Sequence, residues 1–296
     1  MLPLGCDLAN HRLSARLALP PMPPALPPRL IVLSVCSALL LAGCYQVPVT
    51  GRRALDAVDD KALKEQSVAK FNEMKKRTPI SRNRDYHDRV QRVGSRIAKV
   101  VFWDLPDADW EFVVFDGPQI NAFAMPGGKV GVFAGLFRVA QNDDQLASVL
   151  AHEIAHITAR HTHERLSQAM LVQGGGLALG GLVAAQTGNI YTAGSAVQTA
   201  SAIGGIGLIL PFDRAKEKEA DHIGLIYMAR AGYNPEEAIK VFEHLEAENA
   251  GKPQPGGWIS THPSYPDRIL QMMDLMPKAL AAYRQSGAKP VPVLVK

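Results

Sequence analysis

Apolar residues recur at helical spacing in the middle of the chain and predict a long helix there. The residues that share this spacing are Leu146, Val149, Leu150, Ile154 and Ile157, and together they form one apolar helix face. Asn142, Asp143 and Asp144 precede this run and offer side-chain oxygens for an N-cap. We therefore expect a helix that begins near residue 142.

The pattern before this helix predicts two helices followed by a small sheet. A flexible stretch to about residue 55 precedes two amphipathic helices, the second marked by Val90, Val93, Ile97 and Val100. Residues 110–116 alternate as a strand does, and residues 129–133 form a second strand behind the turn at 126–128. The expected fold class is α+β, mainly helical, with a small β-sheet beside the central helix. One domain, 56–285, accounts for these elements.

The amino-terminal residues predict export and attachment to a membrane. A short apolar run at 30–40 follows Arg29, which is typical of a secretory signal peptide and too short for a spanning helix. It ends in Leu-Ala-Gly-Cys, which resembles a bacterial lipobox, so cleavage would leave Cys44 as a lipidated first residue that anchors the chain. The alternative is an ordinary cleaved signal that happens to end near a cysteine.

This interpretation divides the chain further. We expect a signal peptide at 1–43 and a lipid-anchored tether at 44–55. Residues 1–21 fit no signal, which favours Met22 as the true start. Tyr45, where aspartate would retain a lipoprotein in the inner membrane, favours the outer membrane of a Gram-negative bacterium. The tail at 286–296 is expected to be flexible.

Cysteine content and charge narrow the chemistry. The chain has three cysteines, and the expected processing leaves neither a disulfide nor a thiolate ligand in the mature protein. The net charge is +4, and the basic residues do not cluster into a block along the sequence. Nucleic acid is therefore not an expected partner. Any metal site must use histidine and carboxylate ligands, a set that suits zinc, although manganese or cobalt would also accept it.

The strongest chemical signal is the H-E-x-x-H pentad His152, Glu153 and His156 within the predicted central helix. Residues four apart point from the same helix face, so both imidazoles can bind one metal ion. Glu153 then lies beside the metal and can act as the general base for a bound water. The pattern predicts a metal-dependent peptidase.

The third ligand decides the branch of zinc enzymes. Ala159 and Thr162 stand where the metzincin pattern has glycine and histidine, which excludes that branch. His161 and His163 are expected at a solvated helix end, off the ligand face. Downstream, carboxylates four residues apart, at Glu217 and Asp221, share one face of another helical segment. A carboxylate there would complete a His, His, Glu site with an open fourth position for water.

The pentad followed by Glu217-Lys-Glu-Ala-Asp221 resembles the membrane-associated gluzincins that include the HtpX heat-shock protease and the CAAX prenyl protease. The resemblance implies a zincin fold, one zinc ion per chain, Glu217 as third ligand and Asp221 as the partner that orients a ligand histidine. Glu219 is the rival ligand, although it lies on the opposite side of the helix.

Three further segments, 47–53, 121–128 and 261–268, resemble the soluble periplasmic branch of this family. That resemblance implies that His262 can occupy the fourth zinc position and block catalysis; the alternative is that it caps the following helix. Arg268 is a candidate to stabilise the oxyanion of the reaction, and a salt bridge on a helix surface is its alternative.

Two segments carry expectations about substrate and membrane. The sheet edge at Asn121, Ala122, Phe123 and Ala124 could hold an extended substrate by strand addition; alternatively, these residues only shape a turn. The glycine- and alanine-rich segment 170–211 contains no charged residue. It is interrupted too often to span a membrane, and we expect two small-residue helices, either as a flap that touches lipid or as a buried pair.

The sequence therefore predicts a zinc-dependent endopeptidase that hydrolyses misfolded or misassembled envelope proteins in the periplasm, with Glu153 as general base. The alternative is a latent zinc-containing chaperone or assembly factor for outer-membrane proteins, in which cleavage is secondary. Expected partners are unfolded envelope polypeptides, the membrane through Cys44, and the outer-membrane assembly machinery.

Overall fold

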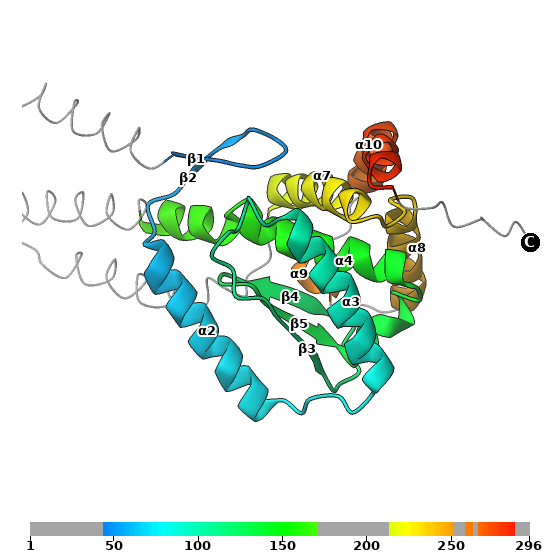
Figure 1. Ribbon diagram of the computed structural model, residues 1–296, viewed down its shortest axis with the longest axis horizontal. Coiled ribbons are helices and arrows are strands. Elements are labelled where there is room, and N and C mark those ends of the chain that lie inside the picture. Colours follow the sequence, from blue (N-terminus) through cyan, green and yellow to red (C-terminus); the bar gives the residue numbers. More distant parts are fainter. Residues whose placement is uncertain (1–43, 171–212, 251–257, 263–265, 288–296) are drawn as a thin grey trace, which may run out of the picture. The chain divides into compact units, whose positions relative to one another are not determined.

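The computed structural model describes residues 44–170, 213–250, 258–262 and 266–287 (Figure 1). The expected signal peptide, nearly all of the uncharged segment 170–211, and residues 288–296 of the tail lie outside them. Among the helices that are described, none combines the length and the apolar character that a membrane crossing requires.

The two helices expected after residue 55 are present. Helix α2 (Asp60–Arg77) begins at Asp59, whose side chain accepts a hydrogen bond from the Ala62 amide. Helix α3 (Arg84–Val100) begins at Asn83, which caps the Tyr86 amide in the same way. Each cap satisfies an amide that would otherwise lack a partner at a helix start. The apolar face predicted for the second helix is buried at Val90, Val93 and Ile97.

The sheet has three strands in the order β3-β5-β4. Strand β3 (Glu111–Phe115) runs parallel to β5 (Lys129–Phe133), and β4 (Ala122–Met125) pairs with β5 in the antiparallel direction. Gly127 and Gly128 turn the chain between β4 and β5 with φ of 90° and 82°, a conformation that favours glycine. Both predicted strands are confirmed. The alternative that residues 121–125 form only a turn is wrong, because β4 is a strand at the edge of the sheet.

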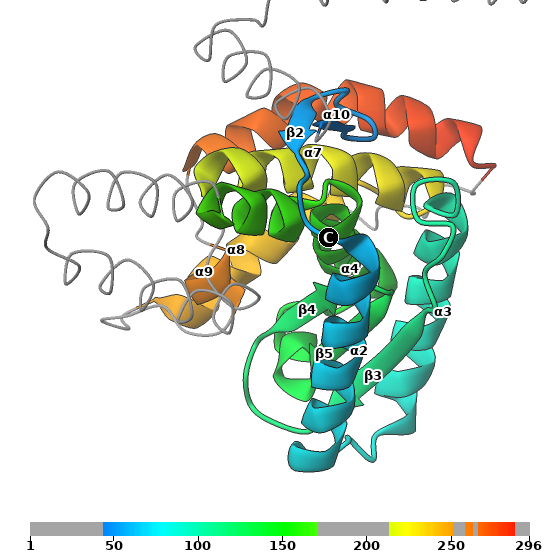
Figure 2. The same ribbon diagram turned by 90° about the vertical axis from the view of Figure 1, so that its left-hand side faces the viewer.

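The central helix α4 (Asp143–Thr158) follows a short 3-10 helix, η1 (Ala134–Arg138), and starts at Asn142 as predicted. It lies between the sheet on one side and α7 (Arg214–Arg230) on the other (Figure 1). Helices α8 (Glu237–Asn249), α9 (Trp258–Thr261) and α10 (Pro266–Gln285) complete the described fold, with α10 packed on α7 (Figure 2). The expected α+β class, mainly helical with a small sheet beside the central helix, is confirmed.

Helices α4 and α7 approach each other closely at Gly224. A Cβ atom at this position would lie 2.9 Å from the backbone nitrogen of His152, which is closer than ordinary van der Waals contact. The absence of a side chain therefore brings the two helices near enough for their facing side chains to meet.

An N-terminal hairpin stands where a flexible stretch was expected. Strands β1 (Cys44–Gln46) and β2 (Arg53–Leu55) pair in the antiparallel direction. Val47 and Ala54 are buried, and Tyr45 donates a hydrogen bond from its hydroxyl to the carbonyl of Thr158 at the end of α4. These contacts attach the hairpin to the domain, and the sequence pattern missed them because the apolar residues of so short a segment show no clear periodicity.

Candidate metal centre

The two histidines of the pentad and Glu217 meet between α4 and α7. The Nε2 atoms of His152 and His156 lie 3.0 Å apart. The Glu217 carboxylate approaches both rings, with Oε2 at 3.4 Å from His152 Nε2 and Oε1 at 3.5 Å from His156 Nε2. All three side chains are buried. Two helices thus bring the three predicted ligands within 3.5 Å of one another.

His262, which follows α9, joins this group. Its Nδ1 atom lies 3.0 Å from Glu217 Oε1 and 3.3 Å from His152 Nε2. One ligand atom from each of the four residues lies within 4.8 Å of every other. Ligands about 2.0–2.1 Å from a zinc ion stand roughly 3.3 Å apart in a tetrahedron, close to the separations found here. The donor set and its spacing therefore fit a tetrahedral zinc ion.

Asp221 holds the ring of His152 in one orientation. Its Oδ1 atom lies 3.0 Å from His152 Nδ1, and an ionised carboxylate only accepts hydrogen bonds. When a metal ion displaces the proton from Nε2, the proton that remains on His152 is therefore held on Nδ1, and Nε2 can bind the metal. Arg268 in turn holds Asp221 with two hydrogen bonds, of 2.7 Å from Nε and 2.8 Å from a terminal nitrogen.

The charges in the site are coupled. Burial alone would lower the pKa of His152, but hydrogen bonds to Asp221 and Glu217 outweigh burial and raise it to about 9. Burial lowers the pKa of His156 well below its ordinary value, and the positive charge of His152 adds to this effect. Burial opposes ionisation of Glu217, yet His152 and His262 together hold its pKa far below its ordinary value. Glu217 is therefore ionised, as a metal ligand must be.

Glu153 is buried beside the group and held by two side chains. Its Oε1 atom accepts a hydrogen bond of 2.6 Å from the indole nitrogen of Trp258 and lies 3.3 Å from His262 Nε2. The rings of Trp258 and His262 stack, with centroids 5.0 Å apart. A carboxylate held this close to a candidate metal position can receive a proton from a water molecule there.

Two histidines predicted at a solvated helix end are buried instead. Helix α4 ends at Thr158, and Arg160 has a φ of 54°, so the chain turns before a further helical segment at 161–170. The positions of His161 and His163 therefore cannot be predicted by continuing the 3.6-residue period of α4 beyond the pentad. His161 Nδ1 lies 2.8 Å from His156 Nδ1, and His163 Nε2 lies 3.0 Å from Asp60. The expectation of solvated positions is wrong for both.

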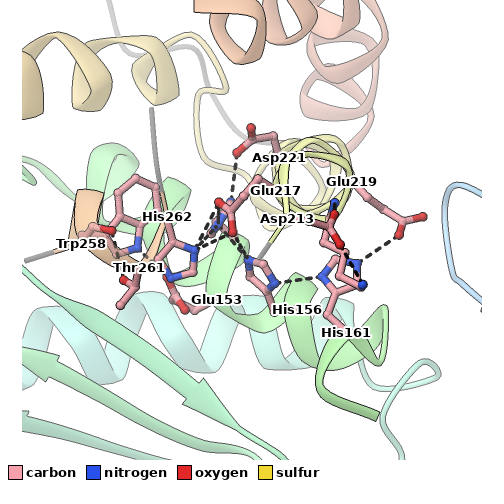
Figure 3. Close-up of polar contacts among 12 residues, drawn as sticks. Glu153, His156, His161, Asp213, Glu217, Glu219, Asp221, Trp258, Thr261 and His262 are labelled. Carbon is pink, nitrogen blue, oxygen red and sulfur yellow. Dashed lines mark hydrogen bonds and ion pairs between the residues drawn. The ribbon is translucent and has the colours of Figure 1, made fainter. Parts of the chain in front are cut away.

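Glu219, the rival ligand, points away from the candidate ligand group (Figure 3). Its Oε2 atom lies 3.0 Å from His161 Nε2 and accepts a hydrogen bond of 2.8 Å from Arg52 Nε. Burial opposes its ionisation, but His161, Arg52 and Thr50 lower its pKa to about 2. Burial also lowers the pKa of His161, despite the contact with Glu219. The pair therefore consists of a carboxylate and a neutral imidazole.

Arg268 is fully buried, so the alternative of a salt bridge on a helix surface is wrong. Besides binding Asp221, its guanidinium lies 3.0 Å from Glu217 Oε2 and donates to the carbonyl of His262 at 3.3 Å. This geometry favours a role in holding the two carboxylates in place. Its contact with the oxyanion stays a prediction.

The outer edge of β4 is the place predicted to hold substrate. Phe133 donates a backbone hydrogen bond to the Asn121 carbonyl. Backbone groups alternate in direction along an antiparallel strand, so those of Ala122 and Ala124 point away from β5. On that same side, the Ile120 carbonyl accepts a hydrogen bond from the Trp258 amide at 2.6 Å. The edge thus runs up to the segment that carries Trp258 and His262, and substrate binding there stays a prediction.

Peptidase family M48 matches residues 85–275, which include every candidate ligand. The chain belongs to this family. It is 38% identical over 216 residues to the mitochondrial metalloendopeptidase OMA1 of Saccharomyces cerevisiae, an alignment that covers 67% of this chain and 58% of the relative. It is 33% identical over 236 residues to OMA1 of Schizosaccharomyces pombe, which covers 79% and 66%.

A bacterial relative is the β-barrel assembly-enhancing protease of Escherichia coli (strain K12), 34% identical over 164 residues. That alignment covers 54% of the M48 chain described here and 33% of the relative. The chain thus matches between one third and two thirds of the length of these proteins. The expected family is confirmed.

Sequence reasoning assigned no role to three features of the site. Trp258 is one of three tryptophans, and only its place in the fold reveals the bond to Glu153. Gly224 in the middle of a helix was a visible signal, because glycine disfavours helices and therefore indicates close packing. Thr50 and Arg52 lie in a segment whose family resemblance was recognised, but no residue pattern connected it to the metal centre.

Proposed function

We propose that the protein is a zinc metalloendopeptidase in which His152, His156 and Glu217 bind the metal. The observation that carries this proposal is the buried group of four residues whose ligand atoms lie within 4.8 Å of one another, adjacent to Glu153. Membership of peptidase family M48 and relatives named metalloendopeptidases support it. When bound, zinc polarises the scissile carbonyl and lowers the pKa of the attacking water.

The side chains around the metal position transfer the proton and hold the ligands in place. Glu153 removes a proton from the attacking water and later delivers it to the leaving amine. Trp258 holds the carboxylate of Glu153 by its 2.6 Å hydrogen bond. Asp221 holds a ring proton of His152 on Nδ1, so that Nε2 can bind the metal. Arg268 offsets the negative charge of the buried Asp221 and Glu217.

The proposed substrates are unfolded or misassembled envelope proteins, bound as an added strand at the outer edge of β4. Backbone pairing of this kind selects extended chains rather than particular side chains. The proposed location is the periplasmic face of the outer membrane, with Cys44 lipidated. The lipobox at 41–44 supports this location, as does the bacterial relative named for β-barrel assembly; the fungal relatives are mitochondrial by name.

A second candidate function is a latent assembly factor for outer-membrane proteins that works with the outer-membrane assembly machinery. His262 favours this function, because its Nδ1 atom lies among the candidate ligand atoms. His262 would therefore take the fourth coordination position of the metal, which a catalytic zinc site leaves to water. If His262 blocks the site, His262→Ala should raise peptidase activity, and unchanged or lower activity would remove the support for latency.

The test of the proposed function is cleavage of an unfolded protein such as reduced casein by the purified chain. We expect cleavage that stops with a chelator, returns with zinc and is absent from Glu153→Gln. A Glu153→Gln protein that still cleaves would refute the general-base assignment. In cells, envelope integrity supported equally by Glu153→Gln and wild type would favour the assembly factor over the peptidase.

A further inference from the structure

A continuous series of hydrogen bonds connects the candidate ligand His156 to the N-terminal hairpin, and Figure 3 labels the three residues at its inner end, His156, His161 and Glu219. From His156 Nδ1 it passes to His161 Nδ1 at 2.8 Å, and from His161 Nε2 to Glu219 at 3.0 Å. Glu219 then accepts hydrogen bonds of 2.8 Å from Arg52 Nε and 2.7 Å from the Thr50 hydroxyl. Both hairpin residues therefore act on the carboxylate that contacts His161.

The donor and acceptor of each of these hydrogen bonds follow from the Glu219 carboxylate and the metal position at the two ends. The Glu219 carboxylate only accepts, so Nε2 of His161 must carry a proton. A metal ion bound at His156 Nε2 leaves the ring proton of His156 on Nδ1, so the 2.8 Å contact requires the facing Nδ1 of His161 to accept. His156 therefore donates from Nδ1, and its Nε2 is left bare toward Glu217 and His152, which is the tautomer that a metal ligand needs.

At the hairpin end of this series of hydrogen bonds, Arg52 is also held by Glu164. The terminal nitrogens of Arg52 donate to both oxygens of Glu164 at 3.0 and 2.9 Å, a two-pronged pairing that fixes the guanidinium plane. Glu164 lies in the helical segment after α4, and Glu219 lies on α7. Arg52 thus joins the two segments that carry His161 and its acceptor. His161 itself is fully buried, so water does not compete for its bonds.

We propose that Thr50 and Arg52 of the N-terminal hairpin set the metal affinity of the site, because they position Glu219, which holds His161 and thereby His156 in the metal-binding tautomer. This inference rests on the proposed function, since it concerns the same metal. His161, Glu219, Arg52 and Thr50 act as positioning residues and do not touch the metal. The consequence is that the segment next to the expected membrane anchor controls how tightly the enzyme retains its zinc.

The test compares zinc dissociation constants by competition with a chromophoric chelator, using the full chain. His161→Phe fills the ring space but offers no acceptor to His156, whereas His161→Asn loses volume and keeps a carbonyl oxygen near the position of Nδ1. We expect His161→Phe to weaken zinc binding by about 10- to 100-fold, and His161→Asn to recover part of that loss. A merely space-filling role predicts the reverse order.

Arg52→Gln tests the hairpin, with Arg92→Gln as its matched control. Arg92 also joins two elements through an ion pair, at 2.7 Å from Asp143, but it has no contact with the proposed series of bonds. We expect Arg52→Gln to weaken zinc binding more than Arg92→Gln does. Thermal unfolding of the zinc-free proteins measures how much each change lowers the melting temperature. The loss of zinc affinity should not correlate with the loss of melting temperature.

The outcomes separate this inference from the proposed function. If the wild type binds one zinc and His161→Phe binds it equally tightly, the inference is overturned while the proposed function stands. Equal zinc affinity of Arg52→Gln and Arg92→Gln likewise overturns the role of the hairpin. If the wild type binds no zinc, the proposed function itself fails.

Discussion

Gly224→Ala should disturb the metal centre while it changes global stability little. The added Cβ would lie 2.9 Å from the His152 nitrogen and 3.0 Å from its Cα. Carbon contacts are most favourable at about 3.5–4.0 Å, so α4 and α7 must separate by roughly 0.5–1 Å. Overpacking costs roughly 1–3 kcal/mol, and replacing glycine within a helix returns about 1 kcal/mol. The expected net loss of unfolding free energy is therefore about 0–2 kcal/mol.

The effect on the site should be larger, because His152 lies on one of these helices and Glu217 on the other. A misplacement of about 1 Å in a catalytic site can cost roughly 100-fold in rate. We expect a comparable loss of cleavage of unfolded casein and weaker zinc binding, with unfolding in urea measured alongside.

The control is Gly94→Ala in α3, whose added Cβ would meet the ring of Phe112 at 2.3 Å, in the contact between α3 and β3. This variant should lose stability and keep its zinc affinity. Full activity and normal zinc affinity in Gly224→Ala would refute the argument that this close approach positions the ligands.

Three further predictions concern the base, the metal and pH. Trp258→Phe should lower kcat by about tenfold or more, because a hydrogen bond to a charged group is lost, and zinc affinity should change little; an unchanged kcat would contradict the role of the indole. Chelation should lower the melting temperature, and zinc at 100 times its Kd should return about 2.7 kcal/mol of stability; a melting temperature indifferent to zinc would argue against a bound metal. Glu219 has its pKa lowered from 4.5 to about 2, so its ionised form stabilises the fold fully above pH 4.5 and the contribution is lost as pH falls toward 2. In the zinc-free protein, the difference in unfolding free energy between wild type and Glu219→Gln should shrink across that window, and a constant difference would speak against the ion pair.

Local patterns predicted the elements that lead up to and contain the pentad, whereas the hairpin of β1 and β2 and the helices α8 and α10 had no such prediction. Helix α4 followed from its apolar spacing and the N-cap at Asn142, and β3 and β5 followed from alternation and from the turn at Gly127 and Gly128. The pairing of His152 with His156 followed from helix geometry alone, since residues four apart share a face. Glu217 and Asp221 were selected by their spacing together with the family resemblance.

The features that sequence patterns missed depend on contacts between distant segments. His161 was misplaced because the helical projection assumed that α4 continues, whereas the chain turns at Arg160 with a positive φ. The hairpin contacts of Arg52 join residues more than a hundred positions apart, and no periodicity reports such a pair. Trp258 reaches Glu153 over a similar separation. Such contacts arise from tertiary packing, which the local pattern does not determine.

The most direct test of the central claim is the zinc content of Glu217→Gln and Glu219→Gln, measured by native mass spectrometry after equilibration with limiting zinc. Both changes remove one carboxylate from α7, two residues apart, and keep the side-chain volume. The proposed site predicts one zinc in the wild type, none in Glu217→Gln, and one in Glu219→Gln, bound more weakly than in the wild type because Glu219 positions His156 through His161 without touching the metal. Zinc retained by Glu217→Gln and lost by Glu219→Gln would contradict the assignment of the third ligand.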